Sequence, residues 1–307
     1  MEDAASSAWL RAMRAPARSA QRALGHALVN RVAGDDRSAR AQVIWAKPGD
    51  RWFAPSDPIW VVHADASMFC GGVAALLLQT LHPLAMAGVA GHSGYRGDPW
   101  GRLQRTSNFI ATTTYATIPD AEAMIAKVNH IHTRVRGKDH RGRPYRADDP
   151  HLLGWVHAAE AYAFLVAHQR FGDGGLTEAD YDRYVAQIGQ ISARLGVLDP
   201  PQNQAELYHR LASYRPELEV SEAALDACRF MLEEPPIAAH LKPGFALIAA
   251  GGLALLPDWA REPLGLNAGT LRRGLRGIAG SFATAAARWG LAGIDDESRS
   301  GAASRAA

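Results

Sequence analysis

Two histidines stand two residues apart in the stretch "NHIHTRVRG" (residues 129–137) and are the first candidates for chemistry. Imidazole nitrogens bind metal ions and exchange protons near neutral pH. Residues of a helix advance by about 100° each, so the side chains of His130 and His132 point about 200° apart. The two histidines therefore cannot bind one metal ion from the same helix, and at most one of them faces the protein interior.

His132 is the histidine that continues an apolar stripe. At steps of four, three, four and three, the stripe consists of Ala121, Ile125, Val128, His132 and Val135. This periodicity places His132 on the side of the helix that faces the core, and His130 toward solvent. Two interpretations of His132 remain open: a satisfied core histidine, or a single axial ligand of haem iron with apolar walls around the porphyrin.

The segment upstream, residues 90–116, sets cations and hydroxyl groups beside apolar residues. A helix is expected to begin near Trp100, and one side of it carries Arg102, Arg105, Thr106, Phe109 and Thr113. Burial of such polar groups is costly unless they serve a purpose. They could bind carboxylates, orient a bound oxygen species or pair with Asp98 and other acids. Arg134 and Arg136 likewise either face solvent or reach an anion such as a haem propionate.

Helical signals dominate the chain. Alanine-rich segments with apolar spacings of three and four predict helices at 68–90, 104–116, 120–135, 151–170, 177–195, 204–214, 221–233 and 269–290. A short β-like piece is expected within 51–65, and a hairpin-like loop within 137–149. The prediction is all-α: one helical domain at 41–291, an N-terminal helical extension at 1–40 and a disordered tail at 292–307.

Composition limits the partners and the location. Lys and Arg (33) nearly balance Asp and Glu (31), so no general attraction to nucleic acid is expected. Cys70 and Cys228 form no disulfide framework, and no apolar run reaches the ~20 residues that span a bilayer. The N-terminus has no recognisable export signal. We therefore expect a cytoplasmic protein without a transmembrane segment, and the sequence gives no indication of its oligomeric state.

Three stretches together carry a resemblance to a known family: "LHPLAMAGVAGHSGYRGDPWGRLQRT", "HTRVRGKDHRGRPYRADDPHLLGWVHA" and "LLPDWAREPLGL". In order and spacing they resemble the DUF2236 family, which includes rubber oxygenase (latex-clearing protein) and MpaB-type oxygenases, over residues 45–275. This resemblance implies an all-α fold with a globin-like core around a b-type haem, and dioxygen chemistry on apolar substrates. His132 then matches the proximal ligand of the haem iron, and Arg102 and Thr106 match the arginine and threonine on the distal side.

Two positions depart from rubber oxygenase. Arg105 stands where that enzyme has a lysine that can occupy the sixth iron position, and a guanidinium does not ligate iron. Arg105 would instead act on a distal oxygen ligand through its charge. Residues 82–101 contain no glutamate, although rubber oxygenase has its catalytic base upstream of the arginine motif; the titratable candidates there are His82, His92, Tyr95 and Asp98. This argues against cleavage of polyisoprene.

The resulting hypothesis is a haem b-dependent oxygenase or peroxidase-like oxidase that uses dioxygen or peroxide on a small apolar or biosynthetic substrate. His132 would bind the iron, and Arg102, Arg105 and Thr106 would polarise a distal oxygen ligand. His157, in the apolar stretch "WVH", is the alternative iron ligand, and Glu160 one turn later is its expected local partner. A non-catalytic, globin-like haem sensor or carrier is the alternative function, and a helical protein without a cofactor is the third.

Overall fold

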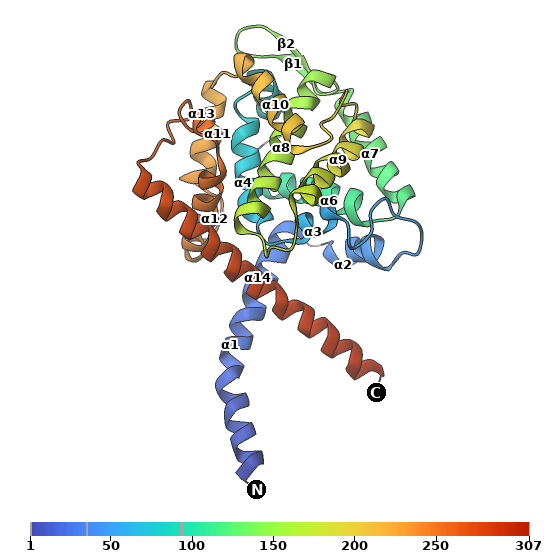
Figure 1. Cartoon of the computed structure of the whole chain (residues 1–307), viewed down its shortest axis with the longest axis vertical. Helices are drawn as coiled ribbons and strands as arrows, with labels where there is room; N and C mark the ends of the chain where they lie inside the picture. Colours follow the sequence, from blue (N-terminus) through green and yellow to red (C-terminus); the bar gives the residue numbers. More distant parts are fainter. Residues whose placement is uncertain (1, 35, 93–94, 307) are drawn as a thin grey trace.

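The computed structural model describes the backbone of residues 2–306 except 35, 93 and 94, and the side chains of residues 16–294 with the same gaps. Within this range the chain is predominantly helical, and its described strands form one small two-stranded sheet (Figure 1). The prediction of an all-α protein is confirmed.

The first half of the chain contains α1 (Glu2–Ala33), α2 (Arg37–Ala41), the π-helical turn η1 (Gln42–Ala46), α3 (Pro58–Ala64), α4 (Met68–Gln79), α5 (Pro83–His92), α6 (Pro99–Tyr115), α7 (Ile118–His132), β1 (Arg136–Lys138) and β2 (Pro144–Arg146). The second half contains α8 (Pro150–Phe171), α9 (Glu178–Leu195), α10 (Gln204–Tyr214), the 3₁₀ turn η2 (Arg215–Glu217), α11 (Glu222–Leu232), the 3₁₀ turn η3 (Ala239–Leu241), α12 (Lys242–Leu255), α13 (Asp258–Arg261) and α14 (Thr270–Ala306).

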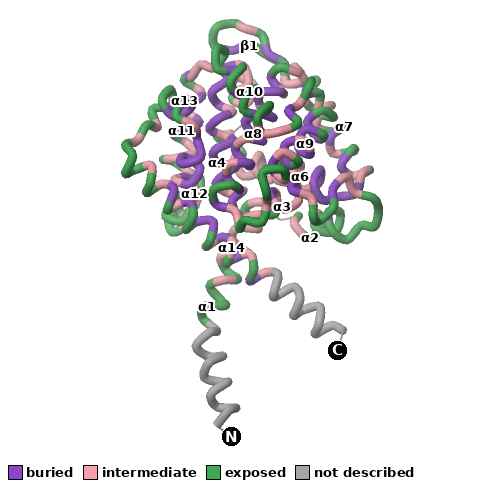
Figure 2. The backbone as a smooth tube through the Cα atoms, in the orientation of Figure 1, coloured by how far each residue is buried: buried purple, intermediate pink, exposed green. Residues whose placement is uncertain are grey.

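Helix α8 occupies the centre of the body and is buried on most of its sides (Figure 2). Its sequence is apolar around the whole circumference, which is the pattern of a helix enclosed by others. Trp155 and Leu165 have no exposed surface. Helices α3, α4, α9, α10 and α12 pack around α8 and complete the core.

The predicted β-like piece at 51–65 is wrong, because residues 58–64 form helix α3. Pro58 occupies the first turn, where its fixed φ suits a helix and its missing N–H costs nothing. The β-branched residues Ile59 and Val62 are fully buried, and Ile59 donates its backbone N–H to Gln187 Oε1 at 3.0 Å. Tertiary packing here outweighs the local preference of these residues for strands.

The helix predicted over 68–90 is two helices, α4 and α5, which break before Pro83. Proline cannot donate the backbone hydrogen bond that a continuous helix needs, and it restricts the residue before it. His82 therefore lies in the connection between the helices. Among the described residues no single helix is long and apolar enough to span a bilayer, and α3 with α4 passes such a test only as a pair bent by 93°.

Helices α6 and α7 follow one another in the chain and pack together. Asp98 caps α6 by accepting a hydrogen bond from the backbone N–H of Gly101 at 2.9 Å. The extended residues Ala116 and Thr117 end α6 and begin α7, and Asp120 in the first turn of α7 accepts a hydrogen bond from Thr117 Oγ1 at 2.5 Å. The expected hairpin follows as β1 and β2, with Gly137 paired to Tyr145.

Helix α14 packs on the body through small side chains. A Cβ atom on Gly280 would lie 2.7 Å from the Cα of Gly251 in α12, and one on Gly25 would lie 2.3 Å from the carbonyl oxygen of Gly290. These contacts join α14 to α12 and to α1. Helices α1 and α14 cross below the body (Figure 1). The α14 backbone is helical through Ala306, but the side chains of residues 295–307 lie outside the described part, so the predicted disorder of 292–307 and the division into segments stay predictions.

We expect Gly280→Ala to destabilise the protein by about 1–3 kcal/mol, because the new methyl group meets backbone atoms of α12 that cannot move away. Gly274→Ala in the same helix is the matched control, since nothing lies within 4 Å of a Cβ there. The control should stabilise the protein by about 0.5–1 kcal/mol through helix propensity alone. Urea unfolding measures both, and a stabilised Gly280→Ala variant would refute the close contact.

Candidate functional site

His132 is the last residue of α7, and its imidazole is half-buried. Its Nδ1 atom is buried without a hydrogen-bond partner, and neither ring nitrogen bonds to another described residue. Burial lowers the pKa of His132, which keeps the ring neutral at neutral pH. A neutral, unbonded imidazole is chemically suited to bind a metal. The neighbouring His130 is exposed, as the apolar periodicity predicted.

Asp148 is the acid beside His132, and the sequence patterns did not single it out. Its charge opposes the effect of burial and raises the pKa of His132. Its Oδ1 atom is itself buried without a hydrogen-bond partner, although Arg146 lies 3.3 Å away. Carboxylates beside metal-binding histidines commonly accept the N–H of the second ring nitrogen and fix the ring. Asp148 can take that part toward Nδ1 of His132.

Arg102 and Arg105 have different surroundings, although both lie on α6. The Arg102 side chain is half-buried and makes no hydrogen bond or ion pair with any described residue. Burial, and then the charge of Arg105, lowers the pKa of Arg102. Arg105 is exposed and bonds Asp98 Oδ2 at 3.0 Å, one of the alternatives that the sequence left open. Thr106 is exposed and forms no side-chain hydrogen bond with the described residues.

His132 and Arg102 lie on successive helices, α7 and α6, which pack against each other. Each lies fifteen residues from Thr117 in the connection, one before it and one after it. An unbonded imidazole can bind a metal ion, and an unpaired guanidinium can hold an anionic group.

His157 remains a second candidate for a ligand. It is only 6% exposed on α8, and its Nε2 atom is buried without a hydrogen-bond partner. Burial, with a smaller effect of Arg210, lowers its pKa to about 4. The expected pairing of His157 with Glu160 is wrong, because no hydrogen bond or ion pair joins them. His157 is enclosed more tightly than His132, which leaves less room for a porphyrin.

Four polar residues from four helices meet inside the body, and we call them the interior polar cluster: His63, Thr114, Glu160 and Tyr184. His63 Nδ1 lies 2.9 Å from Thr114 Oγ1, and His63 Nε2 lies 3.4 Å from the Tyr184 hydroxyl. Burial lowers the pKa of His63 to about 3. Burial, and then the negative charge of Glu160, raises the pKa of Tyr184. Hydrogen bonds therefore join α3, α6 and α9, and Glu160 on α8 acts on Tyr184 through its charge.

Glu160 is the member of this cluster without a partner. Its carboxylate makes no hydrogen bond or ion pair with any described residue, and burial raises its pKa to about 7. The Glu160 side chain is half-buried. An unpaired carboxylate with a perturbed pKa is the kind of group that concentrates at functional sites. The sequence held a signal for it: Glu160 is the only Asp, Glu, Lys or Arg between Asp149 and Arg170.

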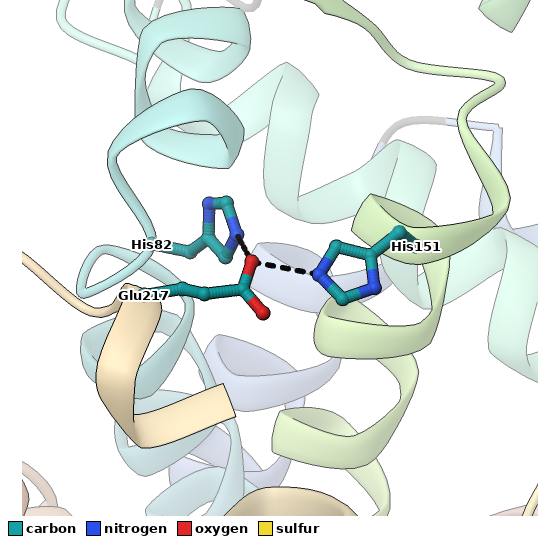
Figure 3. Close-up of side chains that lie close together, drawn as sticks. All are labelled: His82, His151 and Glu217. Carbon is teal, nitrogen blue, oxygen red and sulfur yellow. Dashed lines mark hydrogen bonds and ion pairs between the residues drawn. The ribbon is translucent and has the colours of Figure 1, made fainter. Parts of the chain in front are cut away.

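A second set of metal-binding groups lies at the α4–α5 connection, where Figure 3 shows His82, His151 and Glu217 side by side (Figure 3). Their ligand atoms lie within 4.8 Å of one another. Glu217 Oε2 lies 2.7 Å from His151 Nε2 and 3.8 Å from His82 Nε2. Two imidazoles and a carboxylate suit zinc or iron.

Two features weigh against a metal ion at this second set. The Glu217 carboxylate already bonds His151. The positive charge of Arg143 also lies nearby: burial is the main cause that lowers the pKa of His82, and Arg143 adds a smaller effect in the same direction. We interpret this set as a junction that connects α5, α8 and η2.

A family model for the catalytic domain of "ER-bound oxygenase mpaB/B'/Rubber oxygenase" matches residues 60–289. The match runs from α3 into α14 and includes His132, Arg102 and Glu160. No curated protein and no solved structure matches the chain. Since the match covers well over half of the 307 residues, the chain belongs to the family of the ER-bound oxygenase mpaB/B'/rubber oxygenase catalytic domain, as its motifs indicated.

Proposed function

We propose that this oxygenase-family protein is a haem b-dependent oxygenase or peroxidase-like oxidase, with His132 as the proximal iron ligand. The observation that carries the proposal is the half-buried, neutral His132 imidazole without a hydrogen-bond partner. Haem iron, when bound, supplies the activation of dioxygen or peroxide. The substrate class we propose is a small apolar or biosynthetic compound, and the cytoplasmic location and globin-like core stay predictions.

Arg102 is the residue that we propose to act on anionic groups at this site. Its guanidinium has no carboxylate to neutralise it, so its charge and its donors are available to a propionate or to a distal oxygen ligand. Arg105 forms an ion pair with Asp98, which offsets its positive charge, so Arg105 would contribute less than Arg102. The Thr106 hydroxyl, free of intramolecular hydrogen bonds, would donate to the same distal ligand.

Glu160 is our candidate for the group that exchanges a proton with the substrate. The segment in which rubber oxygenase has its base contains no glutamate here, whereas Glu160 is unpaired and has a pKa near the pH at which enzymes work. At neutral pH a group with such a pKa is present in both its protonated and its ionised form, so it can give a proton to the substrate or take one from it. The neighbouring Tyr184 and His63 would hold the carboxyl group within a neutral environment.

We expect His132→Gly to lose the Soret band of haem-loaded protein, because the iron loses its protein ligand, and external imidazole to restore it. His130→Ala should keep the band, since its side chain is exposed. Absorption spectra of the ferric, ferrous and CO-bound forms provide the measurement. Loss of the band only in His157→Ala would overturn the assignment, and wild type without any band would sink the haem proposal.

We expect Arg102→Leu to weaken azide binding to the ferric protein by about 10–100-fold, since a charge-assisted hydrogen bond contributes roughly 1.5–3 kcal/mol. Arg105→Leu is the matched comparison and should change the affinity by less than about threefold, because Asp98 already offsets its charge. Spectral titration measures both affinities. Equal losses in the two variants would contradict the separate roles of the two arginines.

We expect the protein to lose stability as the pH rises through the range in which Glu160 ionises. Its pKa is raised from 4.5 to about 7, so between these values the native state holds a proton that the unfolded chain has released. The loss is complete above pH 7 and amounts to about 3 kcal/mol at 1.36 kcal/mol per pKa unit.

Glu160→Gln should remove this loss, so that it exceeds wild type in stability by about 3 kcal/mol at high pH and equals it below pH 4.5. Urea unfolding over this pH range measures the difference. Glu122→Gln, at an exposed position, should follow wild type throughout. A Glu160→Gln variant that is less stable at every pH would show that the carboxylate is paired after all.

The alternative function, a non-catalytic haem sensor or carrier, predicts the same spectra. The two functions separate on turnover, because an oxygenase consumes dioxygen or peroxide with a co-substrate and a sensor only binds its ligand. Oxygen-electrode measurements on haem-loaded protein with an electron donor and a panel of apolar compounds distinguish them. Consumption that Glu160→Gln suppresses while the Soret band stays intact would support the enzyme.

A further inference from the structure

Helix α14 carries large apolar side chains on its outward face, which we call the α14 stripe. Leu271 is 80% exposed, Ile278 68% and Phe282 63%, and Leu275 and Trp289 are also exposed. Their spacings of four, three, four and seven place all five on one line of the helix, over about 27 Å. We propose that the α14 stripe lies on the surface of an anionic lipid membrane, parallel to it and without crossing it.

The opposite face of α14 fixes the stripe in its outward orientation. Small residues fill that face, and a Cβ on Gly280 or Gly277 would lie within 2.7 Å of α12 or of Arg170. Rotation of the helix about its axis would press leucine and phenylalanine side chains into backbone atoms of α12. The exposed stripe is therefore the consequence of packing that only small residues permit, and the large side chains cannot turn inward.

An exposed row of this size indicates a partner. Scattered apolar residues are normal on protein surfaces, whereas contiguous apolar patches mark interaction sites. Here five large side chains, two of them aromatic, follow one another along a single helix. Helices that lie in a membrane interface have this form, with Trp, Phe and Leu on the buried side and arginine on the other.

The charge of the surrounding surface identifies the partner as anionic. Residues 270–294 of α14 contain four arginines and no Asp or Glu, and residues 16–33 of α1, which crosses α14, contain three arginines and no acid. Over their full lengths α14 has six arginines and three acids and α1 has five arginines and two acids, so each helix carries a net charge of +3, whereas the whole chain carries only +2. Arg18, Arg22, Arg272 and Arg276 form no ion pair with any described residue.

An open groove beside the N-terminal end of the stripe adds to this positive surface. It has a volume of about 840 Å³ and lies between α8, α12, α13 and the first turn of α14. Arg170, Arg261 and Arg273 line it, and Asp258, its only acidic lining residue, pairs with Arg261 and Arg273, so the lining has a net positive charge. Arginines at such a place suit the phosphate of a lipid headgroup.

A second copy of this chain fits the stripe less well. A two-fold contact through α14 would bring the same basic helix from each copy together, because α14 keeps a net charge of +3 even with its three acids, Asp295, Asp296 and Glu297, included. Like charges across an interface oppose association. An anionic bilayer supplies the opposite charge and an apolar layer at once.

The test is sedimentation of the full-length protein with vesicles. Wild type should pellet with vesicles of equal parts phosphatidylcholine and phosphatidylglycerol, and much less with pure phosphatidylcholine. The double variant Leu275→Glu/Phe282→Glu should have a partition coefficient into the vesicles at least about tenfold lower than wild type. The reason is that burial of each of these apolar side chains contributes more than the 1.4 kcal/mol that corresponds to a tenfold change. Leu198→Glu, at a residue that is 66% exposed and lies outside α14, is the control and should bind like wild type.

Circular dichroism and the urea midpoint should be unchanged in both variants, since all three positions are exposed. Arg272→Glu should reduce binding to the anionic vesicles alone. Wild type that stays in the supernatant with the anionic vesicles, or a double variant that binds as well as wild type, overturns the proposal. So does light scattering that shows a dimer which the double variant converts to monomer without any vesicle binding, because the stripe would then be an interface between copies.

Discussion

The burial of helix α8 is the constraint on which the arrangement of the other helices depends. Its whole circumference is apolar, so it is stable only when other helices cover every side. The polar residues within it must then be neutral or paired. His168 meets this condition with Tyr181, whose hydroxyl lies 3.1 Å from His168 Nδ1, whereas Glu160 has no such partner. The Glu160 carboxyl group, which has no hydrogen-bond partner, is the reason why we regard α8 as part of a candidate catalytic site.

Much of the fold followed from the sequence where periodicity and terminating residues agreed. The helices predicted at 177–195 and 204–214 match α9 and α10 within one residue at each end, since Thr177 and Asn203 cap them. The prediction failed where tertiary contacts decided the outcome. Ile59 and Val62 favour strands by themselves, and only their burial under α9 makes α3 a helix.

The candidate site was predictable in part. The apolar stripe separated His132 from His130, but only the family resemblance suggested that His132 binds iron. The shared face of α6 did not reveal that Arg105 reaches Asp98 while Arg102 has no partner, because that depends on how each side chain meets its surroundings. The interior polar cluster was invisible, since His63 and Tyr184 come together only through contacts between helices far apart in sequence.

Helix α14 can form only late in folding, because the face that packs on the body consists of small residues. Residues 270–294 include five glycines, each of which disfavours a helix by about 1 kcal/mol relative to alanine. An isolated segment of this composition is a poor helix in water, so it becomes helical mainly when α12 and α1 hold it. The aligned row of leucine, isoleucine, phenylalanine and tryptophan therefore comes into existence only after the body has folded. A chain that is still being synthesised therefore does not yet expose the α14 stripe.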